Sequence, residues 1–338
     1  MHRVIGFLVL VLSFGLGWLW LDFRSFEATP LALPEAGVVH TLSPGGSVGT
    51  LAEDLRAAGY LDERGARYLQ WLAWTSGRAG QLKAGEYALA AGLTPAGLLD
   101  LLVSGKVVQH ALTVPEGWTF RQLRAALRGH EAVRHTLDGL SDAQVMAALG
   151  RLGEHPEGRF FPDTYRFPRG TTDVEFLTRA YKRMAGVLDE AWRARAPNLP
   201  LATPYEALVL ASIIEKETGL ADERPQIAGV FVRRLQKGMR LQTDPTVIYG
   251  MGDEFQGDLR RRDLETDTPY NTYARAGLPP TPIALPGRDS LLAALAPASG
   301  DSLYFVARGD GSHQFSATLD EHRKAVDRYQ RRKAPATP

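Results

Sequence analysis

The pattern of apolar positions begins with one uninterrupted run, Val4 to Leu21, which carries no charge over 18 residues. That length is close to the shortest helix that crosses a bilayer. Arg3 precedes the run, and Trp18 and Trp20 lie at its far end, where aromatic side chains favour the interface. A cleaved signal peptide is the alternative, although no small-x-small cleavage site follows. We expect residues 1–22 to form an uncleaved, single-pass anchor in the cytoplasmic (inner) membrane. The rest of the chain should then lie on the periplasmic or extracytoplasmic side.

Short alternating and helical patterns after the anchor predict a small α+β unit. Residues 23–37 contain prolines and are expected to be a linker. The unit itself covers residues 38–114, a usual size for an independent module. Its expected elements are strands at 38–42 and 83–89, helices around 51–58 and 68–73, a helix capped by Thr94 and ended by Gly105, and a weaker strand at 107–114.

The rest of the chain, residues 115–330, predicts a larger α+β domain, and residues 331–338 read as a disordered tail. Apolar residues recur at helical spacing in several segments and then alternate near the C-terminus. The expected helices lie at 120–127, 143–149, 172–185, 203–219, 225–235 and 291–295, and the expected strand pair at 303–307 and 311–316.

The helix predicted over 203–219 carries the main candidate for chemistry. Thr203 and Glu206 form a capping-box pattern around Pro204, and Gly219 is expected to end the helix. Glu217 falls on the apolar face of this helix and in its last turn. Burial and the negative end of the helix dipole both disfavour a charged carboxylate, so its pKa should rise.

A carboxyl group that stays protonated near neutral pH is suited to act as a general acid. The bland alternative is that Glu217 reaches solvent, or is neutralised by a structural arginine. Glu215 is two residues away and is expected to face the other side of the helix, where it either orients the site or is solvated.

Polar residues that could hold a hydroxyl-rich ligand follow this helix. Gln242, Asp244 and Thr246 stand within five residues, and Asn271 and Tyr273 follow in a second segment. Amides and hydroxyls match sugar hydroxyls, and aromatic rings match sugar C–H surfaces. Asp244 is also expected to cap a helix that starts at Pro245.

Composition narrows the chemistry further. The 338 residues are 44% hydrophobic, and the formal net charge of +1 gives no reason to expect nucleic acid. The absence of cysteine excludes disulfides, thiolate catalysis and thiolate metal ligands. The eight histidines are scattered without a His-Glu-x-x-His pair, so neither a metal nor another cofactor is expected.

Several long motifs resemble one family, the endolytic murein transglycosylases of the MltG (YceG-like) family. The first two are Ala211-Ser-Ile-Ile-Glu-Lys-Glu-Thr-Gly219 and Arg240-Leu-Gln-Thr-Asp-Pro-Thr-Val-Ile-Tyr-Gly-Met-Gly252. The resemblance extends over nearly the whole chain through Phe161-Pro-Asp-Thr-Tyr165, Tyr270-Asn-Thr-Tyr273, Gly277-Leu-Pro-Pro280, Tyr304-Phe-Val306 and Gly311-x-His-x-Phe315. The anchor and the small unit also fit this family. The strand and the Thr-Pro helix of the small unit resemble LysM modules, which bind glycan. The alternative is that this unit is a plain spacer domain.

The resemblance implies an enzyme that cuts nascent peptidoglycan strands internally and leaves 1,6-anhydro-muramyl ends. It also implies peptidoglycan synthases as partners. A Glu followed by Ser or Thr is the acid in lytic transglycosylases, and Glu217 with Thr218 matches this pattern. The residues expected to hold the substrate are Gln242, Asp244, Thr246, Asn271 and Tyr273, with Glu215 as an orienting group.

Two other functions fit the same residues. A true muramidase would need a second carboxylate, for which Asp244 and Glu265 are the candidates. A glycan-binding scaffold of the cell envelope would need no chemistry at Glu217. We find no Ser-x-x-Lys motif for a serine acyl-enzyme.

Overall fold

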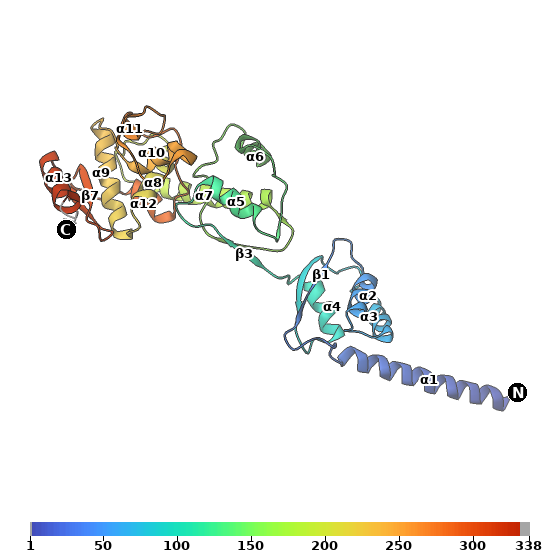
Figure 1. Cartoon of the computed structure of the whole chain (residues 1–338). Helices are drawn as coiled ribbons and strands as arrows, with labels where there is room; N and C mark the ends of the chain where they lie inside the picture. Colours follow the sequence, from blue (N-terminus) through green and yellow to red (C-terminus); the bar gives the residue numbers. More distant parts are fainter. Residues whose placement is uncertain (1, 332–338) are drawn as a thin grey trace, which may run out of the picture. The chain divides into compact units, whose positions relative to one another are not determined.

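The computed structural model describes residues 2–331, and the chain divides into two compact units (Figure 1). The first unit contains Met1–His110 and Arg166–Gly170, and the second contains Ala111–Tyr165 and Thr171–Pro338. Helices and strands occur in both, so the α+β assignment is confirmed. The tail predicted for 331–338 lies outside the described residues except for Arg331.

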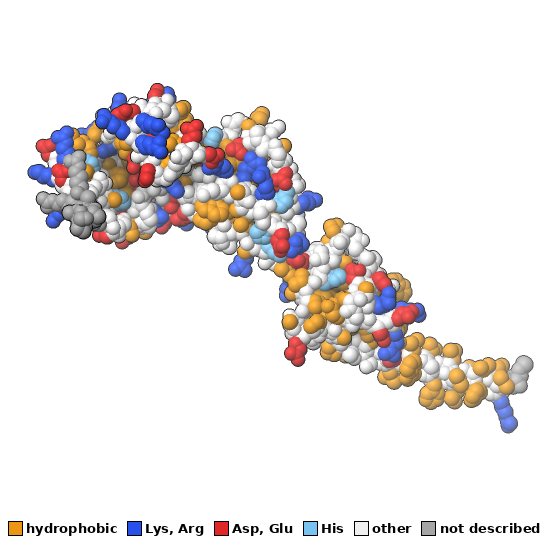
Figure 2. All heavy atoms as spheres, viewed as in Figure 1, with side chains coloured by type: hydrophobic (Ala, Val, Ile, Leu, Met, Phe, Trp, Pro, Cys, Tyr) orange, Lys and Arg blue, Asp and Glu red, His pale blue; other side chains and the backbone are white. Residues whose placement is uncertain are grey.

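The anchor segment forms the helix α1 (His2–Ala28), whose large apolar side chains from Val4 to Leu21 are exposed (Figure 2). An 18-residue stretch within Arg3–Ala28 has a mean hydropathy of 2.3, and the helix is long and apolar enough to cross a membrane. Apolar side chains left uncovered over such a length need a partner other than water.

The segment expected to be a linker, residues 23–37, packs onto the first unit instead. α1 continues to Ala28, and the Phe23 ring lies 4.2 Å from that of Trp71, centroid to centroid. Phe23 and Leu31 are both buried in the core of this unit. Phe23 and Phe26 are three residues apart, so their rings lie on one face of the helix, and both contact the Tyr68 ring. The prolines that follow had suggested that no helix would form here.

Besides α1, the first unit contains two paired strands and three helices. Its elements are β1 (Val38–Leu42), α2 (Val48–Ala57), α3 (Glu63–Thr75), β2 (Gly85–Leu89) and α4 (Pro95–Ser104). β1 and β2 are antiparallel, with Val38 opposite Leu89. α4 starts and ends as its sequence predicts, because Thr94 accepts a hydrogen bond from the Gly97 amide and Gly105 takes the left-handed conformation with φ 72°.

The second unit is mainly helical. Its helices are α5 (Phe120–Arg128), α6 (Asp142–Ala148), α7 (Asp173–Arg193), α8 (Pro204–Glu217), α9 (Arg224–Gln236), α10 (Asp244–Met251), α11 (Arg261–Glu265), α12 (Arg288–Leu295) and α13 (Leu319–Val326). Short 3-10 turns lie at Ala221–Glu223 and Gly252–Glu254, and a π turn at Asp327–Arg331.

Each sheet in residues 2–331 has only two strands. The remaining pairs are β3 (His110–Thr113) with β5 (Thr164–Phe167), β4 (Val133–Arg134) with β6 (Thr171–Thr172), and β7 (Tyr304–Ala307) with β8 (His313–Ser316). β7 and β8 are antiparallel and place Phe305 opposite Phe315. Both rings pack against the main core, so this hairpin is joined to the helices.

The core of the second unit is built around α8. Every residue from Ala207 to Ile214 is buried, because α7, α9, α10 and α12 pack around the helix. The two-sided pattern expected for 203–219 therefore describes only the end of the helix. Packing on all sides fixes the direction of the last turn, which carries Glu217.

Candidate active site

The start of α8 follows its sequence closely, but its end does not. The Thr203 hydroxyl accepts a hydrogen bond from the Glu206 amide, and Pro204 occupies the first turn. The Glu206 carboxylate accepts from the Ala202 amide, so the capping box is incomplete. The prediction that a left-handed Gly219 ends the helix is wrong: Thr218 turns to an extended conformation with φ −144°, and its hydroxyl accepts from the Leu220 amide.

Glu217, the last residue of α8, is partly buried and is held by a hydroxyl. The Thr243 side chain donates a hydrogen bond to Glu217 Oε1. Burial raises the pKa of Glu217 to about 7, the nearby negative charge of Asp244 adds to this, and the Thr243 hydrogen bond acts in the opposite direction. The expected rise is therefore present, with desolvation as its main cause.

Glu217 lines a pocket of about 470 Å³ in the second unit. Three of the residues expected to hold a ligand, Gln242, Asp244 and Tyr273, line the same pocket. Its other walls come from Arg234 and Leu241, from β7 and β8, and from α13 and the turn after it, with Tyr304, Phe305, Val306, Ala307, His313, Leu319, His322, Val326 and Gln330. The pocket thus joins segments spread over more than a hundred residues.

Asp244 and Tyr273 form a pair at this pocket. The Tyr273 hydroxyl donates a hydrogen bond to Asp244 Oδ1 at 2.6 Å. Burial is the main cause that raises the pKa of Tyr273, and this hydrogen bond is the second, so the phenol stays protonated. α10 begins at Asp244, and no side chain caps it. The prediction that Asp244 caps this helix is therefore wrong, since its carboxylate is directed to Tyr273.

Thr246 and Asn271 support the loops behind the pocket and do not line it. Thr246 is fully buried, and its hydroxyl bonds with the Thr243 carbonyl and the Thr272 hydroxyl. The Asn271 amide group donates to three carbonyls between residues 263 and 266, and its oxygen accepts from the Tyr273 amide. Because these polar atoms bond within the chain, both residues have a supporting role here, and their contact with a ligand stays a prediction.

Glu215 also lies away from the pocket, on another side of α8, as its spacing predicts. Its carboxylate accepts from the Gly287 amide at 2.9 Å and the Ser290 hydroxyl at 2.7 Å, and it lies 3.4 Å from Arg224. Its side chain is only 6% exposed. Glu215 is neither solvated nor placed to bind a ligand; it fastens the last turn of α8 to α12.

Two residues that support the site, Thr243 and Arg234, carry no signal in the sequence. Thr243 lies between two residues with a predicted role, but nothing in its local pattern indicates that its hydroxyl reaches Glu217. Arg234 donates from Nη1 to the carbonyls of Arg240 and Leu241 and to Gln242 Oε1, which orders the loop before Thr243. Gln242 has φ 54° in this loop, a conformation uncommon for a residue with a side chain.

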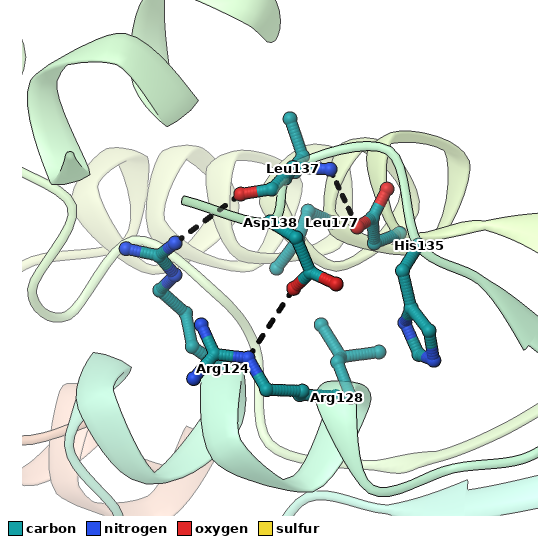
Figure 3. Close-up of a pocket in the computed structure, with 8 residues that line it drawn as sticks. Arg124, Arg128, His135, Leu137, Asp138 and Leu177 are labelled. Carbon is teal, nitrogen blue, oxygen red and sulfur yellow. Dashed lines mark hydrogen bonds and ion pairs between the residues drawn. The ribbon is translucent and has the colours of Figure 1, made fainter. Parts of the chain in front are cut away.

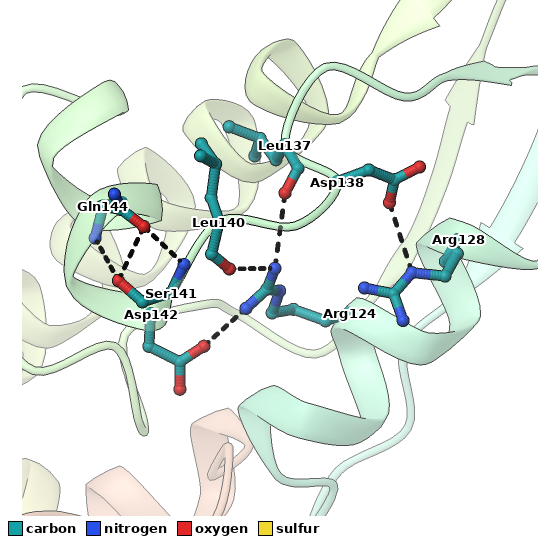
Figure 4. A network of polar contacts seen from close by, with 8 residues as sticks. All are labelled: Arg124, Arg128, Leu137, Asp138, Leu140, Ser141, Asp142 and Gln144. Carbon is teal, nitrogen blue, oxygen red and sulfur yellow. Dashed lines mark hydrogen bonds and ion pairs between the residues drawn. The ribbon is translucent and has the colours of Figure 1, made fainter.

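A second, much smaller hollow of about 20 Å³ lies between α5 and α7 (Figure 3). Its charged groups already have partners, because Arg128 bonds with Asp138 and the buried Asp173 accepts from the Leu137 amide. Figure 4 shows that Arg124 continues this network to Asp142 and to two carbonyl groups. The hollow has room for about one water molecule, so we assign it a structural role.

Comparison with known proteins identifies the family of this chain. Residues 40–328 match the YceG-like family, and the chain belongs to that family. A Bacillus subtilis protein named endolytic murein transglycosylase is 33% identical over 302 residues, covering 84% of this chain and 82% of its own.

A second relative and one solved structure are also similar to this chain. A Streptococcus pneumoniae protein of the same name is 29% identical over 72% of this chain, which spans about half of that protein's length. The crystal structure of a yceG-like protein from Listeria monocytogenes superposes with a TM-score of 0.55 at 29% identity, covering 86% of this chain and all of that one.

Proposed function

We propose that this protein is an endolytic murein transglycosylase that cleaves the β-1,4 bond between N-acetylmuramic acid and N-acetylglucosamine, with Glu217 as its acid. The observation that carries the proposal is a carboxyl group with a pKa of about 7 at the wall of a polar and aromatic pocket. Membership of the YceG-like family and the names of the relatives support it.

The reaction needs one group that first gives and then takes a proton. Protonated Glu217 donates its proton to the glycosidic oxygen while the bond from that oxygen to the muramyl C1 breaks. The resulting carboxylate accepts the proton of the muramyl C6 hydroxyl as its oxygen bonds to C1. This closes the 1,6-anhydro ring, consumes no water and returns Glu217 to its protonated form.

The neighbours of Glu217 suit these two stages. Burial keeps the carboxyl protonated before cleavage, and the Thr243 hydroxyl stabilises the carboxylate that exists between the two proton transfers. Gln242, exposed at the pocket, and Tyr273 with Asp244 offer polar groups to sugar hydroxyls. Glu265, one of the two carboxylates that a muramidase could use, is exposed and paired with Arg261.

The products of purified glycan strands test the reaction. We expect mass spectrometry to find fragments with 1,6-anhydro-muramyl ends, formed from internal bonds. Reducing ends without anhydro sugar would instead establish hydrolysis, with Asp244 as the remaining second carboxylate. If the protein binds strands and releases no fragments, it is a scaffold, and the proposal fails.

The pH dependence tests the assignment of Glu217 separately. We expect kcat/KM to fall about tenfold per pH unit above pH ~7, where the free enzyme loses the acid's proton. Asp244→Asn removes a negative charge that raises the pKa of Glu217, so the falling limb should move to lower pH. Thr243→Val removes a hydrogen bond that lowers this pKa, so the limb should move to higher pH.

The two variants are useful because their shifts have opposite signs, which a general loss of structure cannot produce. Thr266→Val is a matched control, because the Thr266 hydroxyl bonds to the Arg262 carbonyl on an exposed turn and not to Glu217. Shifts in the same direction, or a limb that stays fixed in both variants, would contradict the role given to Glu217.

The N-terminal parts place the enzyme at its substrate in this proposal. α1 anchors the chain in the cytoplasmic membrane, with Arg3 inside and both units outside. The β1–α2–α3–β2 order of the first unit supports a LysM-like module that contacts glycan. An anchored enzyme that cuts nascent strands would work beside the peptidoglycan synthases that make them.

A further inference from the structure

One wall of the pocket, formed by Arg234, Tyr304 and His322, has no role in the steps described above. The Arg234 guanidinium lies 5.0 Å from the centre of the Tyr304 ring, and the His322 ring stacks on Tyr304 with centroids 5.2 Å apart and planes 21° from parallel. All three residues line the pocket that contains Glu217. We call them the Arg–Tyr–His wall.

Arg234 is a buried cation to which the described residues offer no carboxylate. It is 7% exposed, and four acceptors take hydrogen bonds from its Nε and Nη1, whereas its Nη2 has no partner in residues 2–331. Burial lowers the pKa of Arg234, as expected when a charge loses water without gaining an anion. Arg224, on the same helix, shows the usual solution, since three carboxylates lie within 4 Å of it.

His322 adds a second unused polar group to this wall. Its Nδ1 is buried and makes no hydrogen bond with the described part of the chain. Burial and the charge of Arg234 both lower the pKa of His322, so the ring is neutral and can present an N–H donor. Buried polar atoms are rarely left without a partner, and this one belongs to a ring that stacks on Tyr304, which the Arg234 guanidinium also contacts.

We infer that the Arg–Tyr–His wall binds a carboxylate carried by the 3-O-substituent of a muramic acid residue of the glycan. A carboxylate in the pocket would pair with Arg234 Nη2 and would meet the His322 ring on the same wall. The inference rests on the proposed function and names the part of the substrate that this wall recognises. The sugar rings themselves are neutral.

The charges of the pocket would also orient the strand. Asp244 lines the pocket near the protonated Glu217, and its charge disfavours a further carboxylate beside these two residues. His313, which also lines it, is already bonded to Glu223. The acidic substituent is therefore directed to Arg234, and this fixes which sugar presents its glycosidic bond to Glu217.

A set of matched tetrasaccharides tests this, with binding measured by calorimetry to the full chain carrying Glu217→Gln so that the ligand is not cut. The ligands are a chitin tetramer, an alternating muramyl tetramer with free lactyl carboxylates, its lactyl methylamide, and the same tetramer carrying stem peptides. We expect at least one acidic ligand to bind about tenfold more tightly than the methylamide and chitin, since hydrogen bonds to charged groups are worth ~1.5–3 kcal/mol.

The two acidic ligands distinguish the source of the carboxylate. Preference for the free lactyl acid alone means that the wall reads strands without peptides, and preference for the peptide form alone means that it reads a stem-peptide carboxylate. Equal affinity for all four ligands would overturn the inference. The four affinities are compared on the Glu217→Gln chain alone, so the result does not depend on how another variant folds.

His322→Phe keeps the ring stacked on Tyr304 and removes the unpaired nitrogen. We expect it to lower the acid preference several-fold while chitin binding is unchanged; His135→Phe, outside this pocket, should change neither. An acid preference that survives unchanged in His322→Phe would remove His322 from the site. Anhydro products from wild-type enzyme without any acid preference would refute the subsite alone, whereas an acid preference without anhydro products would refute the function alone.

Discussion

Replacing Glu217 by Gln is expected to lower turnover of glycan strands by about 10²–10⁴-fold, the contribution typical of a positioned general acid. The amide has nearly the same shape and can still accept the Thr243 hydrogen bond, but it has no proton to transfer to the leaving oxygen. Release of anhydro-ended fragments from purified strands measures the loss. Glu265→Gln is the control, because Glu265 is exposed outside the pocket and should leave the rate unchanged.

The same substitution should stabilise the protein, and the sign follows from the pKa. Glu217 titrates at about 7 in the folded chain against 4.5 for the group in water, so ionisation opposes folding between these values and fully above them. At pH 8, Glu217→Gln should raise the free energy of unfolding by roughly 1–3 kcal/mol, and by nearly nothing at pH 4.

Urea denaturation at the two pH values measures this difference. A structural role for Glu217 predicts the reverse, since loss of a useful carboxylate would lower stability at pH 8. If Glu217→Gln keeps full activity, the acid is elsewhere, and the remaining carboxylate at the pocket, Asp244, is the next residue to test. Activity and stability together thus separate a catalytic group from a supporting one.

Local rules are enough to place the central helix and its acid. Thr203 and Pro204 fix where α8 begins, and the 3.6-residue period alone assigns Glu217 and Glu215 to different sides of the helix. The same rules place α4 between Thr94 and Gly105. In each case the deciding interaction joins residues within a few positions of one another.

Contacts between distant segments explain what the sequence did not reveal. Arg234, Tyr304 and His322 meet only because β7 packs beside α9 and α13 packs on β7, so no local pattern groups them. Asn271 shows the opposite case. Its side chain resembles that of a ligand-binding residue, but three nearby carbonyls use its donors.

The end of the anchor shows a similar effect. Prolines after residue 28 suggested a flexible linker, whereas Phe23 and Leu31 are buried against helices that come later in the chain. The hydrogen bonds from Tyr68 and Arg64 to Asp22 add to this attachment. Whether an apolar residue beside a proline is part of a linker depends on what covers it, which its own neighbours in sequence do not show.

Replacing Glu215 by Ala is expected to lower the free energy of unfolding of the second unit by roughly 2–4 kcal/mol, because removal of one member of a buried, hydrogen-bonded ion pair leaves its partners unsatisfied. The Gly287 amide and the Ser290 hydroxyl would lose their acceptor. Arg224 would keep Glu116 and Asp289 nearby, which holds the loss below that of a fully isolated charge. Urea denaturation measures it.

Glu190→Ala is the matched control, because Glu190 pairs with Arg288 on the surface, where the change should stay within about 0.5 kcal/mol. Glu215→Gln keeps an acceptor for Ser290 and should lie between the two. Turnover should fall in the order of the stability losses, since Glu215 fastens the turn of α8 that carries Glu217. A stable Glu215→Ala protein with little activity would instead give Glu215 a direct part in the chemistry, against its position away from the pocket.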